Sequence, residues 1–177
     1  MLAKEWKKNA ISVMDKIEET QMENIRKVAE VMADTIEAGR WVHTFGCGHA
    51  NLPIEEMYPR IGGFVGFHPL CELPLTFFTH ITGEMGIHQF LWLERAEGYG
   101  QSIMKSWNFD EKDVVWIFSH TGINAVNIDV ALEAKKRGMK LSYSVQLLRQ
   151  ARKFHATHAE RTCSRLQTTL LTHAALS

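Results

Sequence analysis

The chain has 177 residues, of which 45% are hydrophobic and 23% charged, a composition that suits one globular domain and excludes a disordered chain. No apolar run approaches the roughly 18 residues of a membrane span, and the N-terminus lacks the apolar core of a signal peptide. We therefore expect a cytoplasmic protein with no membrane partner. Its three cysteines, Cys47, Cys71 and Cys163, are widely separated and predict neither a zinc site nor a disulfide framework.

The first part of the chain is helical in pattern and gives way to strands near Gly39. Apolar residues recur at three- and four-residue steps across residues 4–39, which predicts one long helix or two helices with a break near Thr20. A strand, a helix with Pro53 in its first turn, and a second strand are expected next, at 40–45, 51–60 and 64–70.

The second part repeats the alternation of strands and helices. The pattern predicts a helix, a fully buried strand, a helix that stops at Gly138, and the start of a further strand, at 87–105, 114–118, 123–137 and 139–143. Strands that alternate with helices of ten or more residues indicate βαβ units. The expected fold class is α/β, with a parallel sheet covered by helices on both faces.

A hydroxyl-rich turn follows the clearest strand. Residues 119–124, Ser-His-Thr-Gly-Ile-Asn, stand between that strand and a helix, and ligands of open parallel sheets bind beyond the carboxyl ends of strands. Free N–H groups and the positive end of the helix dipole favour an anion there, and the Ser119 and Thr121 hydroxyls can donate to phosphate oxygens. The alternative is a helix N-cap, in which a hydroxyl only satisfies a backbone N–H. The two interpretations are compatible.

A second turn, Gly46-Cys47-Gly48-His49, has the same context of strand, loop and helix. It is not a dinucleotide-binding motif, because the third glycine is missing at the required spacing. Both turns should open on the same edge of the sheet.

Two segments of the chain resemble the sugar isomerase (SIS) domain family of phosphosugar-binding proteins. They are FGCGHANLPIEEMYPRIGGF (45–64) and VVWIFSHTGINAVNIDVALEAKKRGMKL (114–141). The sequence is similar to a bacterial SIS-domain subfamily of unassigned function and, more distantly, to phosphoheptose isomerase. The resemblance implies a doubly wound, Rossmann-like sheet of the flavodoxin type with about five parallel strands, a long N-terminal helix, and assembly into a homodimer or homotetramer.

The resemblance also implies a sugar-phosphate ligand and its contacts. The expected binding residues come from both turns: Gly46, Cys47, Gly48, Ser119, His120, Thr121, Gly122 and Asn124. The turn after the buried strand departs from the family pattern, which is usually richer in serine, because His120 and Ile123 replace small polar residues.

An aldose–ketose isomerase needs a base that moves a proton between neighbouring carbons. By resemblance to a Glu-Glu-x-x-x-Arg pattern, Glu56 is the predicted catalytic base, with Glu55 beside it and Arg60 in a structural role, and His49 assists. The alternative for Glu56 is a solvated pair on a helix surface. Glu84 and His88, four residues apart, could line the same edge; two ligands do not make a metal site, and neither a metal nor a cofactor is expected.

The family pattern stops at residue 142. A doubly wound sheet should continue with a strand, a loop, a helix and a last strand, an order that 142–177 does not offer. When each codon's third base is read with the first two bases of the next codon, 159–173 permits GKNLFEVAD-VID, which resembles the family's last helix and strand. We therefore interpret 142–177 as a frameshifted remainder of the domain formed by 1–141, in which 1–39 is the N-terminal helical segment.

The functional expectation is a protein that binds a phosphosugar and isomerises it. The alternative is a non-catalytic sensor that uses the same pocket. Residues 142–177 carry five basic side chains against one acid, Glu160. This excess could indicate nucleic-acid binding. If the segment is frameshifted, the charge has no functional meaning, and no nucleic-acid partner is expected.

Overall fold

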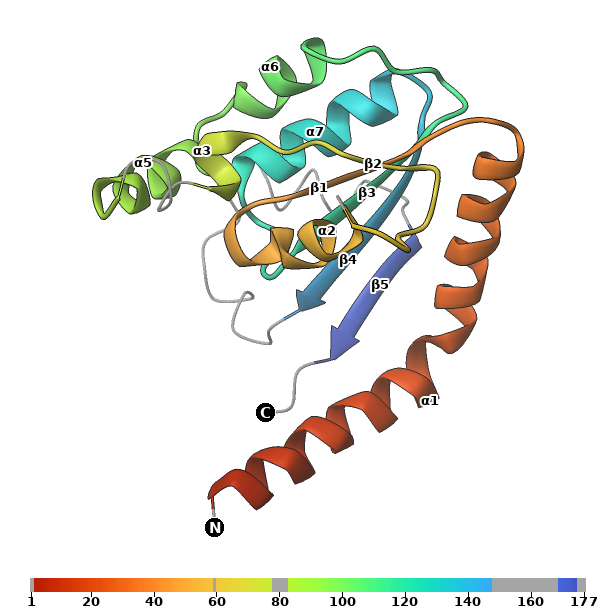
Figure 1. Ribbon diagram of the computed structural model, residues 1–177, viewed down its shortest axis with the longest axis vertical. Helices are drawn as coiled ribbons and strands as arrows, with labels where there is room; N and C mark the ends of the chain where they lie inside the picture. The colour runs from red at the N-terminus through yellow and green to blue at the C-terminus, as the bar shows by residue number, and fades with distance from the viewer. Residues whose placement is uncertain (1, 59, 78–82, 148–168, 175–177) are drawn as a thin grey trace.

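The computed structural model describes residues 2–58, 60–77, 83–147 and 169–174. Within them, five strands form one parallel sheet in the spatial order β2-β1-β3-β4-β5 (Figure 1). The strands are β1 Val42–Gly46, β2 Phe67–Pro69, β3 Val114–Ser119, β4 Lys140–Leu147 and β5 Thr169–Ala174. This is the strand order of a flavodoxin-type doubly wound sheet, in which the direction of winding reverses between β1 and β3. The predicted fold class is confirmed.

The helices lie between the strands in sequence. They are α1 Leu2–Glu37, the short 3₁₀ turn η1 Gly48–Asn51, α2 Leu52–Met57, α3 Leu73–Thr76, α5 Met85–Leu93, α6 Tyr99–Lys105 and α7 Ala125–Lys136. Along each strand, successive side chains point to opposite faces of the sheet. The core is therefore built in two layers, one on each side of the strands.

The larger core layer lies between the sheet and helices α6 and α7. Phe45, Val115 and Ile117 from the strands pack there against buried side chains of the two helices: Ile103, Met104, Val126, Val130 and Ala134. The other layer is formed by α1, whose Val28 and Met32 pack on Val42 and Val114. Helices thus cover both faces of the sheet, as a buried parallel sheet requires.

Helix α1 is a single helix of 36 residues, which resolves the two alternatives left by its sequence pattern. Thr20 lies inside it, and its hydroxyl donates to the Lys16 carbonyl (2.6 Å). The N-terminal half runs past the rest of the fold (Figure 1). Its exposed apolar side chains include Leu2, Trp6, Ile11 and Met14. Among the described residues, no helix is long and apolar enough to cross a membrane.

The helix predicted at 87–105 is two helices, α5 and α6, and the prediction of one continuous element is wrong. Two contacts to α7 hold the break between them. The Val126 N–H donates to the Glu94 carbonyl (3.3 Å), and the Gly98 N–H donates to Asp129 Oδ2 (2.6 Å). The chain leaves the helical path here because α7 supplies its hydrogen-bond partners.

The expectation that 142–177 has no strand order is wrong for two segments. Strand β4 continues to Leu147, and β5 pairs with it in parallel. The sequence accounts for the longer strand, because apolar residues alternate with polar ones along β4, at Leu141, Tyr143, Val145 and Leu147. The frameshift stays a hypothesis, since most of 159–173 lies outside the described residues.

A buried polar cluster centres on Asp113, whose side chain is 2% exposed. Asp113 Oδ1 accepts from Arg40 Nε and the Trp41 N–H, both at 3.1 Å, and Oδ2 accepts from the Asp110 N–H (2.8 Å) and lies 3.2 Å from His43 Nε2. His43 Nδ1 lies 2.9 Å from His68 Nδ1. If Nε2 of neutral His43 donates to Asp113, its Nδ1 is an acceptor, and His68 must donate to it.

We predict that acid destabilises the protein through these two histidines. Burial lowers the pKa of both His43 and His68 below the ordinary value of 6.5. Below about pH 6.5 the unfolded chain therefore binds more protons than the folded chain, and stability falls as the pH decreases. Urea unfolding at about pH 7.5 and about pH 5.5 measures the loss. His68→Asn should reduce it, whereas His88→Asn, at an exposed position, should not. An equal loss in all three proteins would contradict the prediction.

Candidate functional site

Two loops meet at the carboxyl edge of the sheet, between the adjacent strands β1 and β3. The first loop, Cys47–Asn51, follows β1, and the second loop, His120–Asn124, follows β3. Gly46 is paired with Phe118 in the parallel register, so both loops begin at the same level of the sheet. Ligands of flavodoxin-type sheets bind at this reversal point.

Ser119 ends β3 and closes the second loop. Its hydroxyl oxygen accepts hydrogen bonds from the Gly122 N–H (3.0 Å) and from Asn127 Nδ2 (3.2 Å). A hydroxyl has two acceptor lone pairs and one proton. Because both lone pairs are engaged, any further hydrogen bond of the Ser119 hydroxyl must be one in which it is the donor. An anion requires such a donor. The Gly122 N–H, by contrast, is occupied within the loop.

Helix α7 begins at the second loop without a side-chain cap. Asn124 is the N-cap residue, yet its amide donates to Glu94 Oε2 (2.8 Å) and leaves the helix end uncapped. Within the part of the chain that the structure describes, the N–H groups of Thr121, Ala125 and Asn127 have no hydrogen-bond partner. The N-cap alternative is therefore only partly met, since Ser119 accepts a backbone N–H of the loop but no backbone N–H of α7.

A hydrogen-bond chain connects the two loops. The Cys47 thiol donates to Asn127 Oδ1 (3.3 Å), and the amide of Asn127 donates in turn to Ser119. Burial, together with the charge of Glu94, raises the pKa of Cys47 far above its ordinary value, so the thiol keeps its proton. A permanent donor at Cys47 fixes which way the Asn127 amide faces, and thereby fixes the role of Ser119.

Helix α5 lies against the first loop. At Gly48, whose φ is +55°, an added Cβ would stand 2.7 Å from the ring of Phe90. A side chain at this position would displace the Phe90 ring, through which α5 packs on the loop. Of the other predicted residues of this loop, Cys47 is buried and His49 is exposed.

The predicted base Glu56 lies on the surface of α2. Its side chain is 74% exposed and forms an ion pair with Arg60 one turn later. This arrangement matches the alternative interpretation of Glu56, a solvated pair on a helix surface. A catalytic role for Glu56 stays a prediction. Its neighbour Glu55 is half-buried and accepts a hydrogen bond from Asn51 Nδ2 (2.9 Å).

Sequence reasoning missed two carboxyl groups near the loops. Glu94, at the end of α5, is 8% exposed, and Glu72, just before α3, is half-buried. Burial raises the pKa of both. The sequence signal for Glu94 is an acid that directly follows the apolar helix Met85–Leu93, where a solvated charge is not expected.

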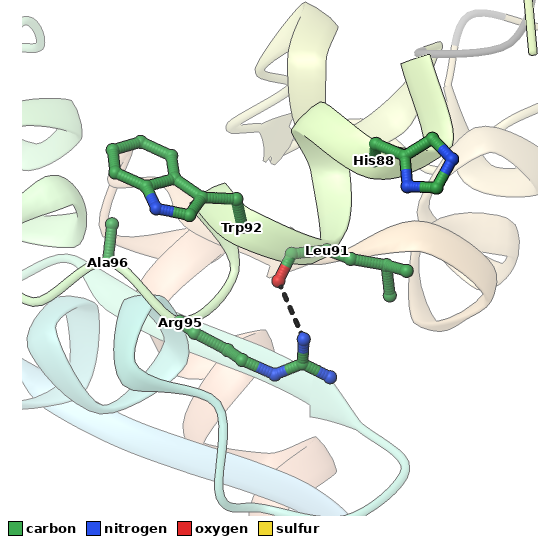
Figure 2. Close-up of a pocket in the computed structure, with 5 residues that line it drawn as sticks. All are labelled: His88, Leu91, Trp92, Arg95 and Ala96. Atoms are coloured by element: carbon green, nitrogen blue, oxygen red, sulfur yellow. Dashed lines mark hydrogen bonds between the residues drawn. The ribbon is translucent and has the colours of Figure 1, made fainter. Parts of the chain in front are cut away.

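Two cavities lie away from the loops. One, of about 340 Å³, is on the surface of α5 and is lined by His88, Leu91, Trp92, Arg95 and Ala96 (Figure 2). The other, of about 370 Å³, is lined by residues at or just before the starts of β1, β3 and β4, among them Arg40, Lys112 and Lys140. His88 thus faces the outer surface of α5, and Glu84 is exposed as well. The described residues contain no cluster of three or more metal-ligating side chains.

The chain is similar to known proteins in sequence. The SIS domain family model matches residues 5–142. A UPF0309 protein from Oceanobacillus iheyensis is 34% identical over 150 residues, which cover 81% of this chain and 59% of that protein. One from Thermoanaerobacter pseudethanolicus is 32% identical over 130 residues, covering 72% and 50%. The chain spans about half the length of the curated relatives that it matches.

The fold is similar to two phosphoheptose isomerase structures. The protein from Francisella tularensis superimposes with a TM-score of 0.65 at 12% identity, over 99% of this chain and 85% of that one. The protein from Neisseria gonorrhoeae gives a TM-score of 0.66 at 16% identity, over 99% and 86%. At this level of identity the likeness concerns the fold alone.

Proposed function

We propose that this chain, which belongs to the SIS domain family by a match over residues 5–142, binds a phosphorylated sugar between the first and second loops. The phosphate lies at the second loop and at the start of α7, and the sugar extends toward the first loop and α5.

The observation that carries this proposal is the uncapped start of α7. Unpaired N–H groups at Thr121, Ala125 and Asn127 stand at the positive end of a helix of 12 residues. The Ser119 hydroxyl, with both lone pairs engaged, adds a donor, and the Thr121 hydroxyl has no partner among the described residues. Donors without acceptors, gathered at a helix N-terminus, favour a phosphate without any lysine or arginine in the loop.

The proposal has two levels, binding and catalysis. Binding needs only the second loop and a surface for the sugar hydroxyls. Isomerisation needs, in addition, a group that takes a proton from one carbon and returns it to the next. The structural likeness to phosphoheptose isomerases and the carboxyl groups of Glu72 and Glu94 near the loops support this second level.

Binding is tested with fructose 6-phosphate as the probe and unphosphorylated fructose as its comparison. We predict that Ser119→Ala with Thr121→Ala weakens binding of the phosphate ester at least tenfold, because each lost hydrogen bond to a charged group costs about 1.5–3 kcal/mol. Titration calorimetry measures the affinity. The matched control is Ser106→Ala, which removes an exposed hydroxyl just after the end of α6.

Two results would contradict the binding proposal. One is equal affinity for the sugar with and without its phosphate. The other is full binding by the double variant, which would place the phosphate elsewhere.

Other aspects of the protein stay predictions. The exposed apolar side chains of α1 support assembly into a homodimer or homotetramer. A cytoplasmic location and the lack of a nucleic-acid partner rest on the sequence alone.

A further inference from the structure

Helix α5 joins the two loops and places one carboxyl group between them. Its Phe90 packs on Gly48 of the first loop, and one turn later the Glu94 carbonyl accepts from the Val126 N–H of α7. The Glu94 side chain reaches Asn124 of the second loop (2.8 Å), and its charge acts on the Cys47 thiol of the first. Glu94 therefore lies where a sugar would extend from a phosphate bound at α7.

The two carboxylate oxygens of Glu94 have different surroundings. Oε2 accepts from the Asn124 amide, whereas Oε1 has only the Arg95 guanidinium, whose NH2 group is 3.6 Å away. That guanidinium is turned back to the Leu91 carbonyl, as the dashed line in Figure 2 shows. No hydrogen bond to Oε1 is present among the described residues. One oxygen of a largely buried carboxyl group is thus left for a ligand.

A buried carboxyl group with this pairing is a better proton carrier than a solvated one. Burial raises the pKa of Glu94, with smaller opposing effects of Arg95 and the Asn124 amide. A raised pKa makes the carboxylate a stronger base, and a general base works best when its pKa lies closer to the operating pH. Glu56, in contrast, is a surface carboxylate held by Arg60.

We propose that Glu94 is a catalytic residue, the group that carries the proton between the first two carbons of the bound sugar phosphate. This inference rests on the proposed function, because it needs the phosphate at the second loop.

The proton transfer takes place in two stages, through an intermediate with a C1=C2 double bond. The Glu94 carboxylate takes the proton from C2 of the open-chain aldose; the C–H electrons form the C1=C2 bond, and the carbonyl oxygen O1 takes a proton from water. The O2 hydroxyl then releases its proton to water as its electrons form the C2=O bond, and C1 takes the proton back from Glu94. The product is the ketose, and the carboxylate is restored.

Glu94 could instead serve only to hold Asn124 in place, and one substitution separates the two roles. In Glu94→Gln the amide oxygen still accepts from Asn124, but the side chain no longer takes up a proton. Glu97→Gln is the matched control, since it makes the same change at an exposed position three residues away.

The experiment follows deuterium incorporation from heavy water into fructose 6-phosphate, ribulose 5-phosphate and a heptulose 7-phosphate. General acid–base catalysis contributes about 10²–10⁴-fold. We expect Glu94→Gln to slow exchange by that factor while fructose 6-phosphate still binds as tightly as to the wild type. Glu97→Gln should exchange at the wild-type rate, and Glu94→Asp should keep part of the activity.

The pH profile gives a readout that a structural role would not change. In the wild type, exchange should rise with pH as Glu94 loses its proton, with the midpoint above the ordinary glutamate range, and the ionisable groups near Glu94 are Arg95 and Cys47. The rise should vanish in Glu94→Gln. Circular dichroism confirms that each variant is folded.

Three results would overturn the inference. They are undiminished exchange in folded Glu94→Gln, loss of exchange in Glu56→Gln alone, and absence of exchange in the wild type with all three probes. The third, combined with tight binding, would leave phosphosugar binding intact and identify a sensor. Failure to bind any probe would instead count against the proposed function.

Discussion

Replacing Asp113 with alanine is expected to lower the free energy of unfolding by about 3–5 kcal/mol, because several donors lose one buried acceptor and each buried donor left unsatisfied costs about 1–3 kcal/mol. The substitution leaves the Arg40 guanidinium, His43 and the N–H groups of Trp41 and Asp110 without their common acceptor. These groups join the start of β1 to the start of β3, so the expected loss concerns the whole sheet. Urea unfolding at neutral pH measures it.

The neighbouring acid provides a matched control. Asp110 pairs with the same Arg40 guanidinium, at 3.0 Å, but its side chain is 40% exposed. Asp110→Ala should therefore cost only about 0–1 kcal/mol, as exposed ion pairs do. Similar losses in the two variants would show that burial is not what makes Asp113 important.

Replacing Gly100 with alanine is expected to cost about 3 kcal/mol, at the upper end for overpacking a core. The new Cβ would stand 2.4 Å from the Val126 carbonyl oxygen and 2.5 Å from Asp129 Cβ. Neither atom can move easily, because both belong to the first half of α7. Helix α6 would have to move away from α7, and the proposed binding site at the start of α7 would be disturbed as well.

Thermal and urea unfolding measure the loss in Gly100→Ala, and phosphate-ester binding measures the effect on the site. Ser102→Ala is the control, since it introduces the same side chain at an exposed position of the same helix. An unchanged Gly100→Ala variant would contradict the close packing of α6 on α7.

The sequence pattern predicted the elements in which every residue, or one whole face, is apolar. Val114–Phe118 is apolar throughout, as a strand covered on both faces must be, and it is confirmed as part of β3. The break between α5 and α6 was not predictable, because contacts with residues about 30 positions later in the chain create it. Apolar periodicity records which face of a helix is buried, but not where a distant segment ends the helix.

The candidate site was predictable in position but not in composition. Because the carboxyl ends of parallel strands share one edge, the two loops were expected to lie together, and the register of Gly46 with Phe118 places them so. Glu94 precedes the second loop by 26 residues, and the sequence of residues 119–124 does not indicate that Glu94 lies beside them. Asn127 is buried in α7, yet its role depends on Cys47, which no spacing rule connects to it.

The site is divided between a stiff part and an adjustable part. Strands β1 and β3 have neighbours on both sides, so the loops that follow them are fixed to the sheet. Helix α5 lies outside the sheet, and its last turn is tied to α7 through Glu94 by a backbone and a side-chain hydrogen bond. Substitutions in α5 should then alter which sugar fits the proposed site, while β1, β3 and the two loops that follow them keep their positions.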